Sequence, residues 1–450
     1  MDLMIKEFIK SYNEYFTLFI VFPFIVLLGI YLTFQLRFIQ LSKLKMSFSY
    51  LIKKQEGGQG NISHFEAISA VLAGNFGTGN ISGMAVALAA GGPGALVWMW
   101  VTAFLGAIIQ YASCVLSVKY RQKNSDHEYV GGPMYYLRNG LGFKTLAIVF
   151  AIFTIFGAFT CGNLTQVNSI ALPLQSYGLN PLLCGIAIAI FVGGVSLGGI
   201  QRVARFASIF VPLKAALYLG TAFIIIGFHW QNVLPAFELM IKSAFNFNSF
   251  AGGVVGYGVI KALTTGFERG VFATDAGTGL VPILQSSAIT KNPIIDGIVT
   301  LVAPLLVMIV CTTTGLVLIV TGAWQQPGLH STNMVSYAFQ EGLGHAMGGY
   351  IVIIALVLFA YTTILAWGCC GEKAIGFIFG PRAAYWFKYL YIAMIPIGAI
   401  SHVEWVWLLA DVSISLMLIT NMIGIAGLSH EVIQESRIFF PKKIKAIETA

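Results

Sequence analysis

Long apolar stretches separated by short polar connections run through nearly the whole chain. A helix needs about 20 mostly apolar residues to cross a bilayer, so this pattern predicts an all-α integral membrane protein with about eleven transmembrane helices. The predicted crossings are 15–38, 63–90, 95–119, 144–175, 181–199, 212–229, 252–285, 294–323, 348–378, 385–402 and 405–432. Two semi-apolar connections, 231–251 and 330–343, are expected to be short helices over the outer mouth, although inert surface helices would have the same pattern.

The second crossing is interrupted, and the rest of the chain is organised around it. Within Val71–Gly94, seven consecutive positions from 74 to 80 carry three Gly, two Asn and one Thr. Each Gly weakens a helix by roughly 1 kcal/mol relative to Ala, so the backbone should unwind there. Unpaired backbone at membrane depth is tolerated only where it is buried in protein or lines a cavity. Small residues also suit close helix packing, but the Asn and Thr residues favour a binding site.

The seventh crossing, 252–285, is also interrupted, and it follows the second by five. Without the first crossing, ten remain, and an odd number per repeat makes the second copy run in the opposite direction. We therefore predict a 5+5 inverted repeat plus one extra N-terminal helix. The predicted boundaries are 1–40 for the extra helix, 61–230 and 252–432 for the repeats, 231–251 for the external segment and 433–450 for the tail.

Composition and charge agree with a membrane protein. Of the residues, 57% are hydrophobic and 10% are charged, whereas a soluble domain carries about 25% charged residues. The net charge of +8 does not indicate nucleic-acid binding, because most Lys and Arg lie in alternate connections. The positive-inside rule then places the N-terminus outside and the C-terminus in the cytoplasm, in a bacterial-type cytoplasmic membrane. One of these cytoplasmic clusters is expected to hold Arg202, Arg205 and Lys214.

A few polar side chains lie inside apolar crossings. Asn163 and Gln166 are three residues apart and share a helix face, so they can face the break. Thr363 and Trp367 are four apart, next to Thr362. These residues could form a site, but interhelical hydrogen bonds and bonds from Thr to its own helix backbone would explain them equally.

Charged residues at membrane depth are functional candidates by default. Glu268, Arg269 and Asp275 are expected toward the inner end of the seventh crossing, where Glu268 or Asp275 with Arg269 could form a gate-like pair at the cytoplasmic side. For Asp411, coupling, gating and a satisfied hydrogen bond all remain open.

The chemistry of an enzyme is not indicated. The sequence has no HExxH spacing, no nucleophile–base set, and no Lys or strand at GNFGTGN as in a phosphate-binding loop. The six Cys lie in apolar segments and resemble small apolar fillers, so neither disulfides, a zinc site nor any cofactor is expected.

Several motifs resemble the alanine or glycine:cation symporter family, the sodium:alanine symporters. They are GNFGTGNISGMAVALAAGGPGALVWMW, YVGGPMYYLRNGLG, GNLTQVNSIA, RGVFATDAGTG and GEKAIGFIFG, in order over nearly the whole chain. One stretch departs from the family pattern, because Ala273–Gly277 reads ATDAG where Ser-Asn-Glu-Ala-Gly is expected.

The resemblance implies the amino acid–polyamine–organocation superfamily, a leucine-transporter-like fold, and uptake of a small neutral amino acid driven by sodium or protons. It implies a substrate site made of Thr78, Gly79, Asn80, Gln166, Thr363 and Trp367. Sodium would be held by carbonyls of Ala73 and Phe76 with hydroxyls of Thr362 and Thr363, and a second position lies near Asn75 and Asn80.

The expected function is therefore sodium-coupled import of alanine or glycine by alternating access. A proton-coupled carrier of another solute, with Asp275 or Asp411 carrying the proton, is one alternative, and a channel is the other. Sequence leaves the oligomeric state, the stereochemical preference and the stoichiometry open.

Overall fold

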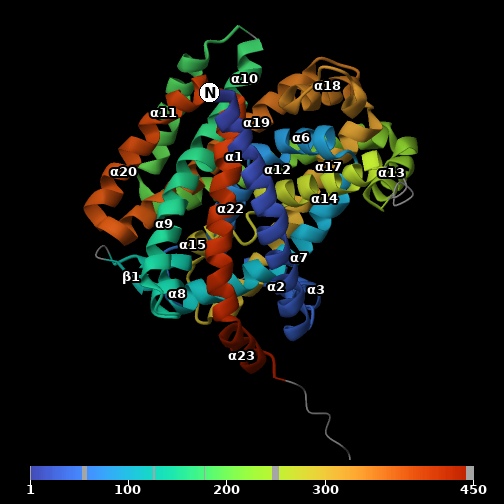
Figure 1. Ribbon diagram of the computed structural model, residues 1–450. Helices are drawn as coiled ribbons and strands as arrows, with labels where there is room; N and C mark the ends of the chain where they lie inside the picture. Colours follow the sequence, from blue (N-terminus) through green and yellow to red (C-terminus); the bar gives the residue numbers. More distant parts are fainter. Residues whose placement is uncertain (1, 53–57, 125–126, 177, 246–252, 442–450) are drawn as a thin grey trace, which may run out of the picture.

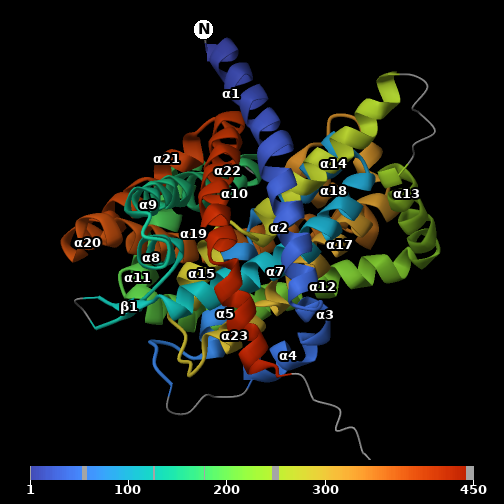
Figure 2. The ribbon, with the colours of Figure 1, turned by 60° about the horizontal axis from the view of Figure 1, so that its bottom comes forward.

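Two interrupted helices lie at the centre of a bundle of long helices (Figures 1 and 2). The computed structural model describes residues 2–52, 58–124, 127–176, 178–245 and 253–441. Helices dominate these residues, and a two-stranded antiparallel hairpin of β1 (Gln122–Lys123) and β2 (Tyr129–Val130) lies in one connection.

The first half of the chain supplies the N-terminal helix and the first five crossings. Its helices are α1 (Asp2–Phe16), η1 (Thr17–Val21), α2 (Phe22–Gln35), α3 (Ile39–Ser42), α4 (Leu44–Ile52), α5 (His64–Asn75), η2 (Thr78–Asn80), α6 (Ser82–Gly91), α7 (Gly94–Lys119), α8 (Pro133–Asn139), α9 (Lys144–Phe159), η3 (Thr160–Leu164), α10 (Thr165–Ser176), α11 (Pro181–Ser196) and α12 (Gly199–Phe228). Helices α1, η1 and α2 form one continuous rod, as do α9, η3 and α10.

The second half supplies the remaining five crossings. Its helices are η4 (Trp230–Asn232), α13 (Val233–Phe245), α14 (Gly253–Thr274), α15 (Leu280–Gln285), α16 (Pro293–Thr300), α17 (Val302–Val320), η6 (Ala323–Gln325), α18 (Ser331–Leu343), α19 (Met347–Phe379), α20 (Pro381–Ala393), α21 (Ile395–Ile400), α22 (Val403–Gly427) and α23 (Ser429–Phe439). Helices α13 and α18 confirm helical structure in the two semi-apolar connections, although residues 246–251 of the first lie outside the described part.

The predicted number of crossings agrees with the structure. By length and composition, eight helices among the described residues can cross a membrane. The shorter α11 and the two interrupted helices, α5–η2–α6 and α14–α15, bring the total to the eleven predicted. The protein is therefore a multi-pass membrane protein.

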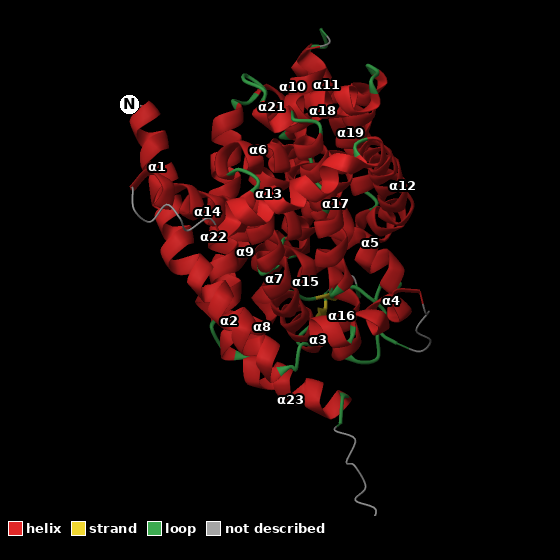
Figure 3. Ribbon diagram, turned by 90° about the vertical axis from the view of Figure 1, so that its right-hand side faces the viewer, coloured by secondary structure: helices red, strands yellow, loops and turns green. Residues whose placement is uncertain are grey.

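The halves of the interrupted helices pair across the centre. Helix α6 packs against α14, and α5 packs against α15. The N-terminus of α1 and helix α18 lie at one end of the bundle, which we call the α18 face; α8 and α23 lie at the other end, the α23 face (Figures 1 and 3). The two broken helices thus run in opposite directions, as an inverted repeat requires.

Local chemistry explains where the interrupted helices begin and break. Helix α5 begins at a capping box, in which the Ser63 hydroxyl and the Glu66 carboxylate satisfy each other's backbone N–H groups. The second break contains Gly277 and Gly279, both with positive φ, a conformation that glycine adopts without steric cost.

Candidate substrate and ion site

The two helix breaks are joined directly by buried asparagines. Asn75 Nδ2 donates to the carbonyl of Thr274, at the second break, over 2.8 Å. Asn80 Nδ2 donates to the Asn75 carbonyl over 2.6 Å, and Thr314 Oγ1 on α17 donates to the Asn80 carbonyl over 3.1 Å. These bonds satisfy carbonyls that the unwound backbone leaves free, so the breaks form one polar centre inside an apolar bundle.

Gln166 closes one side of this centre. Its Oε1 accepts hydrogen bonds from the Thr78 backbone N–H over 3.0 Å and from Thr78 Oγ1 over 3.1 Å. Its Nε2 donates over 3.1 Å to the carbonyl of Cys161, which lies in the π-helical turn η3, where the regular helix bonding is disrupted. The structure therefore brings Gln166 to the first break as predicted, with the amide oxygen rather than the amide donor facing Thr78.

Two glycines of the first break allow this close approach. A Cβ at position 77 would lie 3.0 Å from both Gln166 Oε1 and Thr363 Oγ1, and one at position 79 would lie 2.6 Å from the ring of Phe272. Thr78, Gln166 and Thr363 therefore meet beside Gly77, and their role in substrate binding stays a prediction.

Trp367 lies one turn beyond Thr363 on α19 and is buried. A Cβ at Gly162 would overlap the Trp367 side chain, and one at Gly157 would lie 3.1 Å from its ring. The indole therefore sits in a groove that two glycines open on α9 and η3. The other buried amides point elsewhere: Asn163 donates to the Tyr391 carbonyl, and Asn168 to the carbonyls of Gly398 and Ser401.

The predicted sodium ligands also come together at the end of α5. Thr363 Oγ1 donates to the Ala73 carbonyl over 2.8 Å, and Thr362 Oγ1 lies on the same turn of α19. We call Ala73, Phe76, Thr362 and Thr363 the α5–α19 cage. The cage also contains a residue that the sequence analysis had placed elsewhere, because Lys214 Nζ donates to the Phe76 carbonyl over 2.8 Å and to Thr362 Oγ1.

The assignment of Lys214 to a cytoplasmic connection was wrong. Helix α12 begins at Gly199, about a dozen residues earlier than predicted, which places Lys214 in the middle of the helix with 0% of its surface exposed. The apolar residues on both sides, in FVPLKAALYLG, were the signal that could have placed this lysine inside the bundle.

Arg269 forms an ion pair that also differs from expectation. It pairs with Asp411 on α22 over 2.7 Å, rather than with Glu268 or Asp275. It lies on α14, before the break, and therefore toward the α18 face instead of the end that carries most cations. The predicted position toward the inner end of the crossing was wrong, because Arg269 precedes the break. Which end of the bundle is cytoplasmic stays a prediction.

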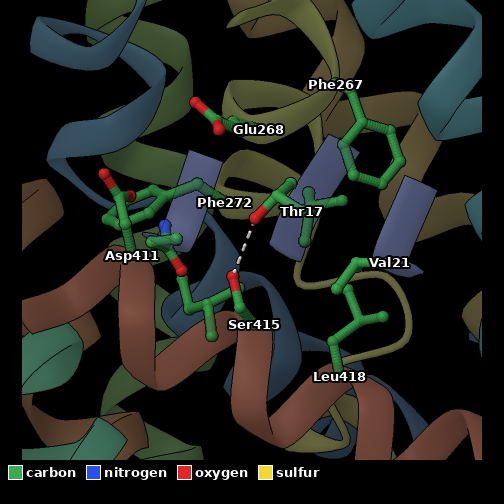
Figure 4. Close-up of a pocket in the computed structure, with 11 residues that line it drawn as sticks. Thr17, Val21, Phe267, Glu268, Phe272, Asp411, Ser415 and Leu418 are labelled. Carbon is green, nitrogen blue, oxygen red and sulfur yellow. Dashed lines mark hydrogen bonds between the residues drawn. The ribbon is translucent and has the colours of Figure 1, made fainter. Parts of the chain in front are cut away.

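A cavity of about 20 Å³ lies beside this pair. Figure 4 shows Glu268 from α14 and Asp411 from α22 around it, with a hydrogen bond of 3.2 Å between Thr17 of η1 and Ser415 of α22. Such a volume holds about one water molecule, which is too small for an amino acid. The N-terminal rod therefore braces the region of the ion pair and does not form a second substrate site.

Asp275 is the remaining buried acid of the second break. Its backbone has φ of 50°, an uncommon value for a residue other than glycine. The side chain is buried, and Oδ1 has no hydrogen-bond partner among the described residues. Asn75 Oδ1 is likewise buried and unpartnered there. Each break therefore contains one buried side-chain oxygen without a hydrogen-bond partner among the described residues.

Comparisons with known proteins agree with this architecture. The family model of the sodium:alanine symporter family matches residues 1–449. The chain is 40% identical over 426 residues to an uncharacterized transporter of Haemophilus influenzae, with 93% of each chain covered. It is 38% identical over 423 residues to the sodium/alanine symporter AgcS of Methanococcus maripaludis, covering 91% of this chain and 92% of the relative.

A third relative carries a different substrate in its name. The probable sodium/glutamine symporter GlnT of Bacillus subtilis is 32% identical over 411 residues, covering 90% of this chain and 84% of the relative. Among solved structures, MhsT in complex with L-phenylalanine superimposes with a TM-score of 0.62 at 14% identity, over 84% of this chain and 93% of MhsT. This likeness confirms the predicted leucine-transporter-like fold.

Proposed function

The chain belongs to the sodium:alanine symporter family, and we propose that it imports alanine or glycine together with sodium by alternating access. The observation that carries this proposal is the joined pair of helix breaks, where η2 presents the Thr78 N–H to Gln166 over 3.0 Å. The N-terminus of a half-helix attracts anions, and broken transporter helices use such ends for a substrate carboxylate. The membrane would be the cytoplasmic one, with the N-terminus outside.

In this proposal the substrate carboxylate lies against the backbone of Thr78, Gly79 and Asn80. One carboxylate oxygen replaces Gln166 Oε1 at the Thr78 N–H, and the Gln166 amide turns its donor to the other oxygen. The substrate ammonium lies near the Thr363 hydroxyl, which faces Gly77, and the substrate side chain points toward Trp367.

Limited space supports a small substrate. The ring of Phe272 lies against Gly79, and Trp367 fills the groove of α9 and η3. A methyl group or a hydrogen on the substrate is therefore favoured over a longer side chain, since interiors of this density resist added atoms.

We propose that sodium binds on the Asn75 and Asn80 side of the break. Asn75 Oδ1 is buried without a partner among the described residues, and the Asn75 and Thr274 carbonyls there accept from the Asn80 and Asn75 amides. Carbonyl oxygens of unwound segments are the ligands that broken transporter helices offer to sodium.

The unpartnered Oδ1 of Asp275 supports one alternative, a proton-coupled carrier in which this carboxylate takes up the proton. Asp275→Asn separates the two ideas. It abolishes uptake driven by a proton gradient if Asp275 carries the proton, whereas sodium-driven uptake continues if sodium binds at Asn75.

The substrate class is tested by competition against labelled alanine in proteoliposomes that contain the purified protein. We expect unlabelled alanine and glycine to compete, and glutamine and phenylalanine to compete at least ten times more weakly. Stronger competition by glutamine than by alanine would contradict the proposed pocket.

A further inference from the structure

Lys214 makes its contacts with the atoms that were expected to hold a free cation. Its Nζ donates to the Phe76 carbonyl over 2.8 Å and to Thr362 Oγ1. Thr362 Oγ1 in turn donates to the Phe359 carbonyl over 3.0 Å, which leaves its oxygen free to accept from the lysine. An ammonium group and a sodium ion both bind oxygens with partial negative charge, such as these.

Besides the two oxygens, aromatic rings lie close to the Lys214 ammonium. Lysine has three donors, and Nζ lies 4.7 Å from the centroid of the Phe359 ring and 5.8 Å from that of Phe76. A cation over an aromatic face is attracted to the ring, most strongly where both groups are desolvated. The charged group of Lys214 is thus surrounded by two oxygens and two aromatic rings.

Among the described residues, no carboxylate neutralises the charge of Lys214. None of the ion pairs between described residues includes Lys214, although its side chain is fully buried. A buried charge without compensation is costly, so helix packing alone does not explain a lysine at this position. The surroundings are instead those of a cation site made of neutral ligands.

We propose that the Lys214 ammonium is the resident cation of the α5–α19 cage and takes the place of a free sodium ion there. It links α12 to the unwound end of α5 and to α19, so the charge that holds these helices together is tethered and is not transported. The coupling ion then binds only on the Asn75 and Asn80 side. This inference rests on the proposed function in one respect, which is that the coupling ion is sodium.

The test counts bound sodium with ²²Na⁺ at saturation on the purified full chain in detergent, without amino acid. Lys214→Ala vacates the cage, so we expect it to bind one sodium ion more per protein than the unsubstituted chain. Adding Thr362→Val to Lys214→Ala should remove that extra ion, because the cage loses a hydroxyl ligand. Lys242→Ala is the matched control, since this lysine on α13 is exposed and forms an ion pair with Glu238 on the same helix.

An equal number of bound ions in Lys214→Ala and the unsubstituted chain overturns the proposal. If Lys214→Ala does not purify as a folded protein, Lys214→Ser replaces it. The serine hydroxyl can hold a water molecule in the space that the lysine leaves. Thr363→Val decides the matter without any change at position 214: the number of bound ions should stay the same, and loss of one ion overturns the proposal. Failure of the chain to transport alanine would count against the proposed function but would not alter these differences.

Discussion

Replacing Gln166 with Ala tests the substrate site most sharply, because two roles of this amide predict opposite results. In the structure Oε1 holds the Thr78 N–H and Nε2 holds the Cys161 carbonyl. If the amide turns its donor to the substrate carboxylate, removing it weakens binding. If the amide only stands in for the carboxylate at Thr78, removing it leaves that N–H free and tightens binding.

We expect weaker binding. A hydrogen bond to a charged group contributes about 1.5–3 kcal/mol, which corresponds to a loss of about 10- to 150-fold in affinity, since each 1.4 kcal/mol is tenfold. The substitution also leaves the buried Thr78 N–H without its Gln166 partner, at a cost of about 1–3 kcal/mol of stability. The unfolding temperature should therefore fall as well.

Asn163→Ala is the matched control. Asn163 is also a fully buried amide of the same segment, but it donates to the Tyr391 carbonyl over 2.7 Å, away from the first break. It should lower the unfolding temperature and leave the affinity for alanine within about twofold, as expected for a group outside the site. Both affinities are measured by binding of labelled alanine to the purified protein. Unchanged or tighter binding by folded Gln166→Ala would refute the donor role.

Two further changes test the pocket wall and the ion pair near the α18 face. Trp367→Leu should relax selectivity toward larger neutral amino acids in competition assays with alanine, serine and leucine, and an unchanged profile would remove Trp367 from the pocket. Asp411→Asn leaves the largely buried Arg269 without its anion, so it should destabilise the protein by up to about 3–5 kcal/mol, seen as a lower unfolding temperature. The exchange Arg269→Asp with Asp411→Arg should recover part of that loss, and strictly additive losses would show that the two charges do not interact.

Much of the fold was predictable because the membrane imposes simple rules on the sequence. The length of the apolar stretches predicted the crossings. Glycines predicted both breaks, together with Asn and Thr in the second crossing. The spacing of five between the breaks predicted their opposite directions. The contact between Asn75 and Thr274 confirms that the breaks meet.

The errors arose where depth in the membrane cannot be read from a linear pattern. Lys214 was counted with a loop because it follows Arg202 and Arg205, whereas α12 continues through all three. Asp411 was not predicted as the partner of Arg269, because it lies about 140 residues away along the chain. The position of a charge in the bundle depends on such long-range contacts, which sequence spacing does not encode.

Uptake of labelled alanine into proteoliposomes, with and without an inward sodium gradient, tests the central proposal most directly. We predict accumulation that requires the sodium gradient, persists when a proton ionophore dissipates the pH gradient, and stops when external sodium is replaced by potassium. Accumulation that follows an imposed proton gradient in the absence of sodium would contradict sodium coupling.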